Sequence, residues 1–272
     1  MSVHTADSGP EQTTIERIAD RLDAALVSHI ATPPVRDVLG STDIAKAYAV
    51  QAELTRRRLA EGRAITGRKI GLTAPAVQRQ LGVDQPDFGV LFDDMAVPDG
   101  GEVDTRRLIQ PKIEAEVAFV LGADLEGSPR ELTYERALAA IDRAVGALEI
   151  VDSRNANWDI TITDTVADNA SSALYVLGDN AVPISEFRPV DVSMTLTKDG
   201  VQESSGTGSA CLGDPVLALL WLARTVAELG SPLRAGEVVL SGALGPMVPV
   251  EPGNHIVAEL SKLGRVSVSF SE

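Results

Sequence analysis

The feature that most constrains the fold of this chain is a change of pattern at Gly62. Before Gly62, apolar residues recur at spacings of three and four, which predicts two amphipathic helices. Ser41 or Thr42 is placed to cap the second helix, and Gly62 closes it. We therefore expect an N-terminal helical region over residues 13–63, preceded by a flexible tail over residues 1–12.

Beyond Gly62 the chain changes to short runs of β-branched and small residues, separated by Gly, Pro and Asp, which predict strands. The runs cover residues 64–72, 113–121, 147–151, 171–177, 191–198, 237–241 and, in pieces, 255–271. Helical patterns at 133–146 and 214–229 interrupt the strands without alternating regularly with them. This order predicts an α+β fold in residues 64–272, with a rolled, mostly antiparallel or mixed sheet rather than a doubly wound parallel one.

The charge balance limits the partners of the chain. It has 24 Lys and Arg against 39 Asp and Glu, a formal net charge of −15. Such a field repels nucleic acid and anionic membrane surfaces, so we expect neither as a partner. It also repels small acidic substrates, so a binder of such anions needs a local positive centre.

The cysteine content and the apolar runs indicate the cellular compartment. Cys211 stands alone and forms no internal disulfide, which suits a reducing cytosol. No apolar run approaches the roughly 20 residues that span a bilayer, and the first residues lack the basic start and apolar stretch of a secretory signal. We expect a cytoplasmic, soluble protein.

Common catalytic motifs are absent from the sequence. His4, His29 and His255 are too scattered for a zinc cluster, and the chain has no nucleophile elbow, phosphate-binding loop or dinucleotide fingerprint. Carboxylate chemistry is what remains.

Three glutamates lie within apolar strand patterns. Glu114 and Glu116 share one face of the 113–121 run, about 6.6 Å apart along a strand, and Glu149 lies in the 147–151 run. Such carboxylates repel one another unless a cation lies between them, and oxygen ligands favour Mg²⁺, Mn²⁺ or Ca²⁺ over zinc. The spacing alone is equally compatible with Glu114 and Glu116 facing water on the sheet surface.

Two further segments have a simple structural interpretation and a functional one. Lys69, in Gly-Arg-Lys-Ile-Gly-Leu-Thr, either extends to solvent, as the pattern alone favours, or binds an anion in a pocket. Asp87 lies in a turn-rich stretch at 82–89, where an aspartate is more commonly an acceptor within the turn. Residues 164–172 read as a small polar loop, and the glycines of 241–247 would let the backbone approach a ligand.

Taken in order, these segments resemble one family. GRKIGLT, LGVDQPDFGVLF, QPKIEAEVAFVL, LEIVDSR, DTVADNASS, SSGTGSACLGDP and SGALGPMVPV are similar to the motifs of the 2-hydroxypenta-2,4-dienoate hydratases, in the fumarylacetoacetate hydrolase superfamily. The match runs from about residue 13 to the last residue. It implies the addition of water to 2-hydroxypenta-2,4-dienoate, or a close homologue, in the meta-cleavage breakdown of aromatic compounds.

The resemblance also implies a site. Glu114, Glu116 and Glu149 would hold Mg²⁺ or Mn²⁺, Lys69 would line the substrate site, and Asp87 and Ser171 would be further active-site groups. The family fold is a distorted β-roll with an N-terminal helical region. It assembles as a homo-oligomer, and the hydratase can associate with the neighbouring pathway enzyme.

Three alternatives remain. The 4-oxalocrotonate (2-oxo-3-hexenedioate) decarboxylases share the glutamates and the lysine, but their loop equivalent to residues 85–89 typically lacks the aspartate and their segment equivalent to 243–247 differs. Hydrolysis of a C–C bond would need a base such as a His–Glu pair, and the histidines lie in a tail, a helix and a late loop. A non-catalytic partner subunit would have a degenerate glutamate set, whereas this set is intact.

Overall fold

The computed structural model describes residues 10–74, 78 and 85–272. A helical region precedes the first strand, as predicted, and further helices lie among the strands. The helices are α1 Pro10–Ser28, α2 Arg36–Leu39, α3 Ile44–Ala60, α5 Tyr134–Ala140, α6 Ile162–Ala167 and α7 Pro215–Glu228. The strands are β1 Ile65–Gly71, β2 Asp87–Phe92, β3 Ala96–Val97, β4 Gly101–Asp104, β5 Lys112–Leu121, β6 Ile141–Val151, β7 Ser172–Leu177, β8 Val182–Pro183, β9 Ser193–Lys198, β10 Val201–Thr207, β11 Val238–Ala243, β12 Val248–Pro249, β13 His255–Leu260 and β14 Gly264–Ser271.

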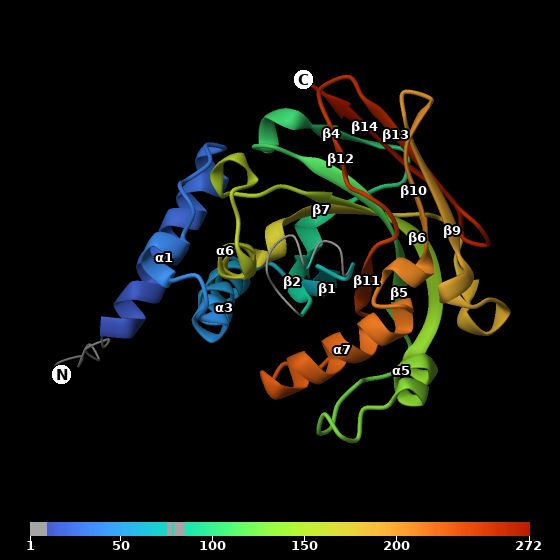
Figure 1. Ribbon diagram of the computed structural model, residues 1–272, viewed down its shortest axis with the longest axis horizontal. Helices are drawn as coiled ribbons and strands as arrows, with labels where there is room; N and C mark the ends of the chain where they lie inside the picture. Colours follow the sequence, from blue (N-terminus) through green and yellow to red (C-terminus); the bar gives the residue numbers. More distant parts are fainter. Residues whose placement is uncertain (1–9, 75–77, 79–84) are drawn as a thin grey trace.

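Two curled sheets organise the described part of the chain. The larger has the order β2-β1-β11-β5-β6-β7-β3, with β12 added to β5 and β8 added to β6; the smaller has the order β10-β9-β13-β14-β4. Most neighbours are antiparallel, but β1–β11, β3–β7 and β4–β14 are parallel. The predicted α+β fold with a mixed, curled sheet and a helical N-terminus is therefore confirmed (Figure 1).

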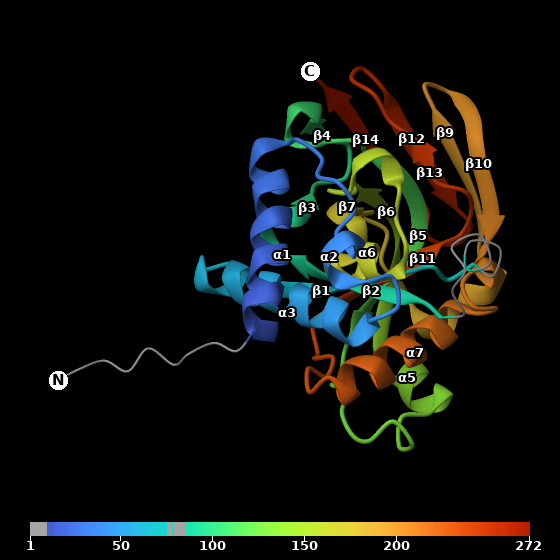
Figure 2. The same cartoon turned by 60° about the vertical axis from the view of Figure 1, so that its left-hand side comes forward.

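The alternation of β5 places its two faces in different surroundings. Ile113, Ala115, Val117 and Phe119 point into the main apolar core, which also contains side chains from α7 and the smaller sheet. The opposite face carries the two glutamates. Figures 1 and 2 show α1, α3 and α6 beside the larger sheet and α5 and α7 beneath it. The side chains of this second face of β5, Glu114, Glu116 and Ala118, are buried as well.

The N-terminal helices form a separate small core with α6. Ile18 and Leu22 of α1 and Val50 of α3 are buried against Ile162 and Val166. Helix α1 begins at Pro10, so the structure extends the helix three residues into the segment assigned to the tail, whose residues 1–9 lie outside the described part.

Three local predictions need correction. Asp43 caps α3, not Ser41 or Thr42, because its side chain accepts the Lys46 N–H. The helix predicted over 133–146 ends at Ala140, and residues 141–146 belong to β6, since pairing with β5 along its whole length outweighs local helical propensity.

The third correction concerns segments interpreted as loops. Residues 164–167 belong to helix α6, Ile162–Ala167, although the sequence predicts them to be part of a polar loop over 164–172. Residues Asp87–Phe92 are a strand, although their first half reads as turn. In both segments tertiary burial determines the conformation, because every residue of α6 and of β2 is buried.

One stretch is long and apolar enough to cross a membrane by length and composition. It is Gly208–Glu228, with a mean hydropathy of 1.4, so the expectation that no such run exists is wrong. Half of this stretch is buried inside the protein, and its helix α7 packs on α5 and β11. Because Leu219 and Leu222 are fully buried in the main core, α7 is a core helix of a soluble protein.

Candidate metal centre

The three predicted glutamates converge on one point of the larger sheet. Glu114 on β5 pairs directly with Glu149 on β6, and Glu116 lies two residues further along the same face. One carboxylate oxygen from each lies within 4.8 Å of the others. The exposed fractions are 7% for Glu114 and 0% for Glu116 and Glu149, so the alternative in which Glu114 and Glu116 face water is wrong.

The protein itself supplies few hydrogen bonds to these carboxylates. The backbone N–H of Gly242 donates to Oε2 of Glu116 at 2.6 Å. Within the described residues, Oε1 of Glu116 and Oε2 of Glu149 accept none. A buried carboxylate without partners is costly, so these oxygens are available to bind a ligand.

Gly242 is required by this geometry. Its φ of 108° is in the left-handed region, and a Cβ at this position would overlap the side chain of Thr73. The pairing of β11 with β5 shifts register between Leu240 and Ala243, which turns the Gly242 N–H toward Glu116. The glycines of this segment thus let the backbone approach a site, as the sequence indicated.

Lys69 on β1 is the cation of this site. Its side chain is buried, and its Nζ lies 3.2 Å from Oε1 of Glu149 and donates to the carbonyl of Ala170 at 3.0 Å. The solvent-extended alternative is therefore wrong. Burial alone would lower the pKa of Lys69, but the surrounding carboxylates, above all Glu149, raise it above its ordinary value. The lysine is held as an ammonium ion.

Asp87 is the first residue of β2 and lies near the lysine. It pairs with Gly71 across the β1–β2 ladder, and its Oδ2 accepts the hydroxyl of Thr165 on α6 at 3.1 Å. Its Oδ1 is buried and has no partner among the described residues. Burial raises the pKa of Asp87, and Lys69 opposes the rise. The side chain therefore does not serve as a turn acceptor, because its partner comes from a distant helix.

Ser171 lies in a strained turn at the side of the site. Asn169, Ala170 and Ser171 form a short 3₁₀ segment, η4, with successive φ values of 52°, 52° and 53°. Left-handed backbone costs an L-residue roughly 1–2 kcal/mol. The Ser171 hydroxyl is buried and has no partner within the described residues, and its neighbour Ala170 holds Lys69.

The electrostatics of the cluster fit a divalent cation. Burial raises the pKa of Glu114 to about 7, and burial together with the charges of Glu149 and Glu114 raises that of Glu116 well above its usual value. Burial also raises the pKa of Glu149, against the opposing effect of Lys69. These carboxyl groups bind protons more tightly than exposed ones, because they are close together and shielded from water. An oxygen-preferring ion between them would replace these protons. Three close carboxylates, two of which have oxygens without a partner among the described residues, are a donor set that Mg²⁺ and Ca²⁺ prefer.

Several groups around the site carry no recognisable sequence signal. The Thr165 hydroxyl, the Ala170 carbonyl and the Asn169 side chain act through contacts that only the fold creates. A buried ion pair, Arg154 with Asp168, lies behind them. Burial raises the pKa of Asp168 to about 6, against the opposing effect of Arg154.

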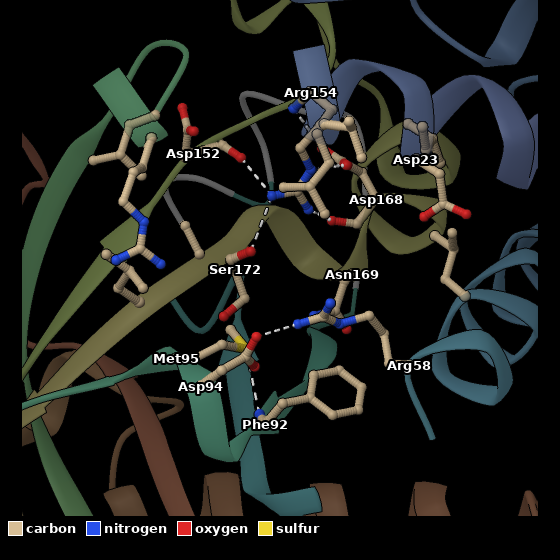
Figure 3. Close-up of a pocket in the computed structure, with 18 of the residues that line it drawn as sticks. Asp23, Arg58, Phe92, Asp94, Met95, Asp152, Arg154, Asp168, Asn169 and Ser172 are labelled. Carbon is tan, nitrogen blue, oxygen red and sulfur yellow. Dashed lines mark hydrogen bonds and ion pairs between the residues drawn. The ribbon is translucent and has the colours of Figure 1, made fainter. Parts of the chain in front are cut away.

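A cavity of about 330 Å³ lies behind the same turn (Figure 3). Its wall includes Arg154, Asp168, Asn169 and Ser172, and its other side comes from α1 and α3. The three glutamates and Lys69 are not among its lining residues. The cavity is therefore separate from the carboxylate cluster, and the segment 168–172 divides the two.

Comparisons with known proteins agree on one family. The family model described as fumarylacetoacetate (FAA) hydrolase C-terminal matches residues 65–270. A protein called TodF product hydratase, from Pseudomonas putida, is 52% identical over 258 residues, which are 95% of this chain and 96% of that relative. A 2-keto-4-pentenoate hydratase from Paraburkholderia xenovorans is 50% identical over 258 residues, 94% of each chain.

A solved structure is similar along almost the whole chain. The 4-oxalocrotonate decarboxylase from Pseudomonas putida G7, complexed with magnesium and adipate, has a TM-score of 0.91 and 34% identity. The match covers 97% of this chain and 100% of that one. The sequence identity to the hydratases is thus higher than the identity to this decarboxylase.

Proposed function

This chain belongs to the fumarylacetoacetate hydrolase family, and on that premise we propose that it is a metal-dependent hydratase of 2-hydroxypenta-2,4-dienoate or a close homologue. It is a hydro-lyase of the 2-keto-4-pentenoate hydratase type, since relatives of that name are about 50% identical along nearly the whole chain. The product is 4-hydroxy-2-oxopentanoate, and the reaction belongs to the meta-cleavage breakdown of aromatic compounds.

The observation that carries the metal requirement is the convergence of Glu114, Glu116 and Glu149, with oxygens within 4.8 Å of one another and buried. These residues would hold Mg²⁺ or Mn²⁺. When bound, such an ion acts as a Lewis acid toward the oxygens of a 2-oxo acid. The oxygens of Glu116 and Glu149 that have no partner among the described residues support this assignment, because buried polar atoms need one.

Lys69 provides the positive centre that an acidic substrate needs in a chain of net charge −15. Three carboxylates and a divalent ion leave one negative charge, and the ammonium of Lys69, 3.2 Å from Glu149, offsets it. Lys69 binds the carboxylate of the substrate, or it takes part in proton transfer to the substrate. Its burial strengthens either effect, because charges interact more strongly away from water.

The reaction needs two proton movements and one water. Loss of the 2-hydroxyl proton and gain of a proton at C5 convert the dienol into 2-oxopent-3-enoate, whose C4 is electrophilic by conjugation. Water then adds its oxygen to C4, and C3 gains a proton. The sum is substrate plus one water.

Asp87 orients or deprotonates this water, and Ser171 is a further group at the site. The support for Asp87 is its Oδ1, which has no partner among the described residues, together with its Oδ2, which accepts the Thr165 hydroxyl; one oxygen is thus left to face a ligand. A positioned acid or base of this kind contributes about 10²–10⁴-fold to rate. Decarboxylation of 2-oxo-3-hexenedioate is the second candidate, because the decarboxylase of Pseudomonas putida G7 has the same fold over almost the whole chain.

One experiment separates the two reactions. The protein with Mg²⁺ is incubated with 2-hydroxypenta-2,4-dienoate and, separately, with 2-oxo-3-hexenedioate; loss of the dienoate absorbance and release of CO₂ are recorded. We expect fast loss of the dienoate, formation of 4-hydroxy-2-oxopentanoate and little CO₂. Rapid CO₂ release with a stable dienoate would establish the decarboxylase instead. Full hydration in the presence of a chelator would exclude the metal requirement.

The remaining expectations concern the setting of the enzyme. We propose that it works in the cytoplasm as a homo-oligomer and associates with the next enzyme of its pathway. The single free cysteine, Cys211, is buried and suits a reducing compartment. Light scattering of the purified protein, alone and mixed with the pathway enzyme, tests both assemblies.

A further inference from the structure

The backbone turn that holds Lys69 has an unusual conformation. Asn169, Ala170 and Ser171 are consecutive left-handed residues, and none of them is glycine. Such a turn persists only where its surroundings hold it in place. The contacts on its two sides therefore determine where the Ala170 carbonyl lies, and this carbonyl accepts the Lys69 ammonium at 3.0 Å.

On one side, the side chain of Asn169 joins the turn to β2. Its Oδ1 accepts the Val90 N–H at 2.7 Å, and its Nδ2 donates to the Val90 carbonyl at 2.9 Å. β2 is the edge strand of the larger sheet, so the amide occupies the place of a neighbouring strand. Gly89 permits this approach, because a Cβ there would overlap the Asn169 carbonyl oxygen.

On the other side, Arg154 fixes the two ends of the turn. Its guanidinium donates to the carboxylate and to the carbonyl of Asp168, and at 3.0 Å to the carbonyl of Ser172 (Figure 3). Asn169 and Arg154 thus hold the turn through two separate sets of hydrogen bonds. Of these two sets, the one from Asn169 connects the turn to the strand that begins with Asp87.

We propose that Asn169 is a positioning residue for Lys69: its amide ties the left-handed turn to Val90 and so sets the Ala170 carbonyl that directs the ammonium toward Glu149. This inference rests on the proposed function, because it assigns Asn169 to the reaction in which Lys69 takes part. Both hydrogen bonds recorded for the Asn169 amide within the described residues go to the Val90 backbone rather than to the glutamates or Lys69. Its effect on rate is indirect.

Two variants of Asn169 test its hydrogen bonds to Val90, and a variant elsewhere in the chain is the control. Asn169→Ala removes both hydrogen bonds, and Asn169→Asp keeps the acceptor for the Val90 N–H and a residue type that tolerates left-handed backbone. We expect kcat to fall about 10–100-fold in Asn169→Ala and less in Asn169→Asp, since displacing a catalytic group by about 1 Å costs that much. KM should change much less. Asn180→Ala, which loses one exposed hydrogen bond to the Lys262 carbonyl, should keep normal kcat.

A double-mutant cycle distinguishes positioning from a general loss of structure. If Asn169 acts through Lys69, adding Asn169→Ala to Lys69→Met should lower the residual kcat no further, because effects on one shared group are not additive. Mg²⁺ binding without substrate, measured by calorimetry, should be unchanged in Asn169→Ala. An additive loss in the cycle, or normal kcat in a folded Asn169→Ala protein, would overturn the proposal.

A crystal structure of Asn169→Ala, or of Asn169→Asp if the first variant does not fold, tests without any substrate whether Asn169 positions Lys69. We expect the Lys69–Ala170 hydrogen bond to be broken in Asn169→Ala and lengthened in Asn169→Asp, which keeps one of the two hydrogen bonds to Val90. If the bond persists at its present 3.0 Å, Asn169 does not position the lysine. A wild-type protein without hydratase activity would refute the proposed function. The crystal structure of the variant would still test whether Asn169 positions Lys69.

Discussion

Glu114 and Glu149 are direct cross-strand partners on β5 and β6, and both carboxylates are buried. Like charges in such a position destabilise a sheet, and burial increases the effect. Asp87 and Glu116 add to this charge, and Lys69 offsets only part of it. The sheet therefore carries an unfavourable arrangement that a bound divalent ion would convert into a favourable one.

Glu149→Gln should abolish the metal site while leaving the fold intact. Outer-shell changes alone cost about 10–100-fold in metal affinity, so loss of a charged ligand should lower Mg²⁺ affinity by more than about 100-fold. Hydration should fall with it. Calorimetric titration with Mg²⁺ and the dienoate assay measure the two effects, and Glu259→Gln, on the exposed face of β13, is the matched control. Unchanged Mg²⁺ affinity would remove Glu149 from the ligand set.

The stability of the metal-free protein should fall as the pH rises. Glu114 has a pKa of about 7 in the folded protein against 4.5 in the unfolded chain, so the folded state binds the proton more tightly between these values. Its stabilising contribution is complete below pH 4.5 and is lost as the pH rises through about 7, which amounts to on the order of 3 kcal/mol.

Urea unfolding of the metal-free protein at about pH 5 and about pH 8 measures this loss. Saturating Mg²⁺ should restore stability at the higher pH, because the ion binds the deprotonated carboxylates of the folded state. Glu114→Gln should flatten the pH dependence. A metal-free protein that is more stable at about pH 8 than at about pH 5 would contradict the assignment.

Lys69→Met should separate catalysis from metal binding. The side chain neutralises a negative site without contributing a ligand oxygen, so we expect kcat to fall about 10²–10⁴-fold while Mg²⁺ affinity stays the same or increases. Lys198→Met, on β9 of the smaller sheet, controls for the loss of a lysine. If the Lys69 variant lost Mg²⁺ binding but kept its turnover at high metal concentration, its proposed role would be wrong.

Asp87→Asn should suppress hydration and spare the metal. Asparagine keeps an oxygen for the Thr165 hydroxyl, so the packing at the start of β2 is preserved while the basic oxygen is lost. A decrease in kcat of about 10²-fold or more is expected for a lost general base. Asp99→Asn, whose carboxylate accepts the Ser267 N–H away from the site, is the control. Normal hydration by Asp87→Asn would exclude this role.

Gly242→Ala should weaken metal binding through the backbone. The added Cβ overlaps Thr73 and would move the N–H that donates to Glu116. Gly62→Ala is the matched control, because Gly62 also has a positive φ but has open space around it. We expect both variants to lose about 1 kcal/mol of stability from the backbone conformation, and only Gly242→Ala to lose Mg²⁺ affinity. Equal Mg²⁺ affinities would show that Glu116 does not depend on this N–H.

The sequence predicted the elements whose patterns are strong and local. The alternation in 113–121 predicted strand β5 and the common face of Glu114 and Glu116, and the apolar spacing in 214–229 predicted α7. It failed for residues 141–146 and for α6. There, pairing with β5 or burial against α3 outweighs short-range propensity, and neither effect is visible in a local window.

For the site, too, some features could be predicted from the sequence and others could not. The sequence by itself determined which side chains are available: three glutamates in apolar strands, a lysine between glycines, and an aspartate before an aromatic residue. It left open whether Glu114 or Lys69 faces water, because a period of two fixes a common face but not what covers that face.

Only the tertiary structure decided that question. The register of β5 with β6 sets Glu114 opposite Glu149, and the pairing of β1 with β11 brings Lys69, from a distant part of the chain, to the same point. The left-handed turn at Ala170 then supplies a carbonyl for the lysine. Side-chain identity is a property of the chain, whereas burial, charge coupling and hydrogen-bond partners arise from contacts between residues far apart in sequence.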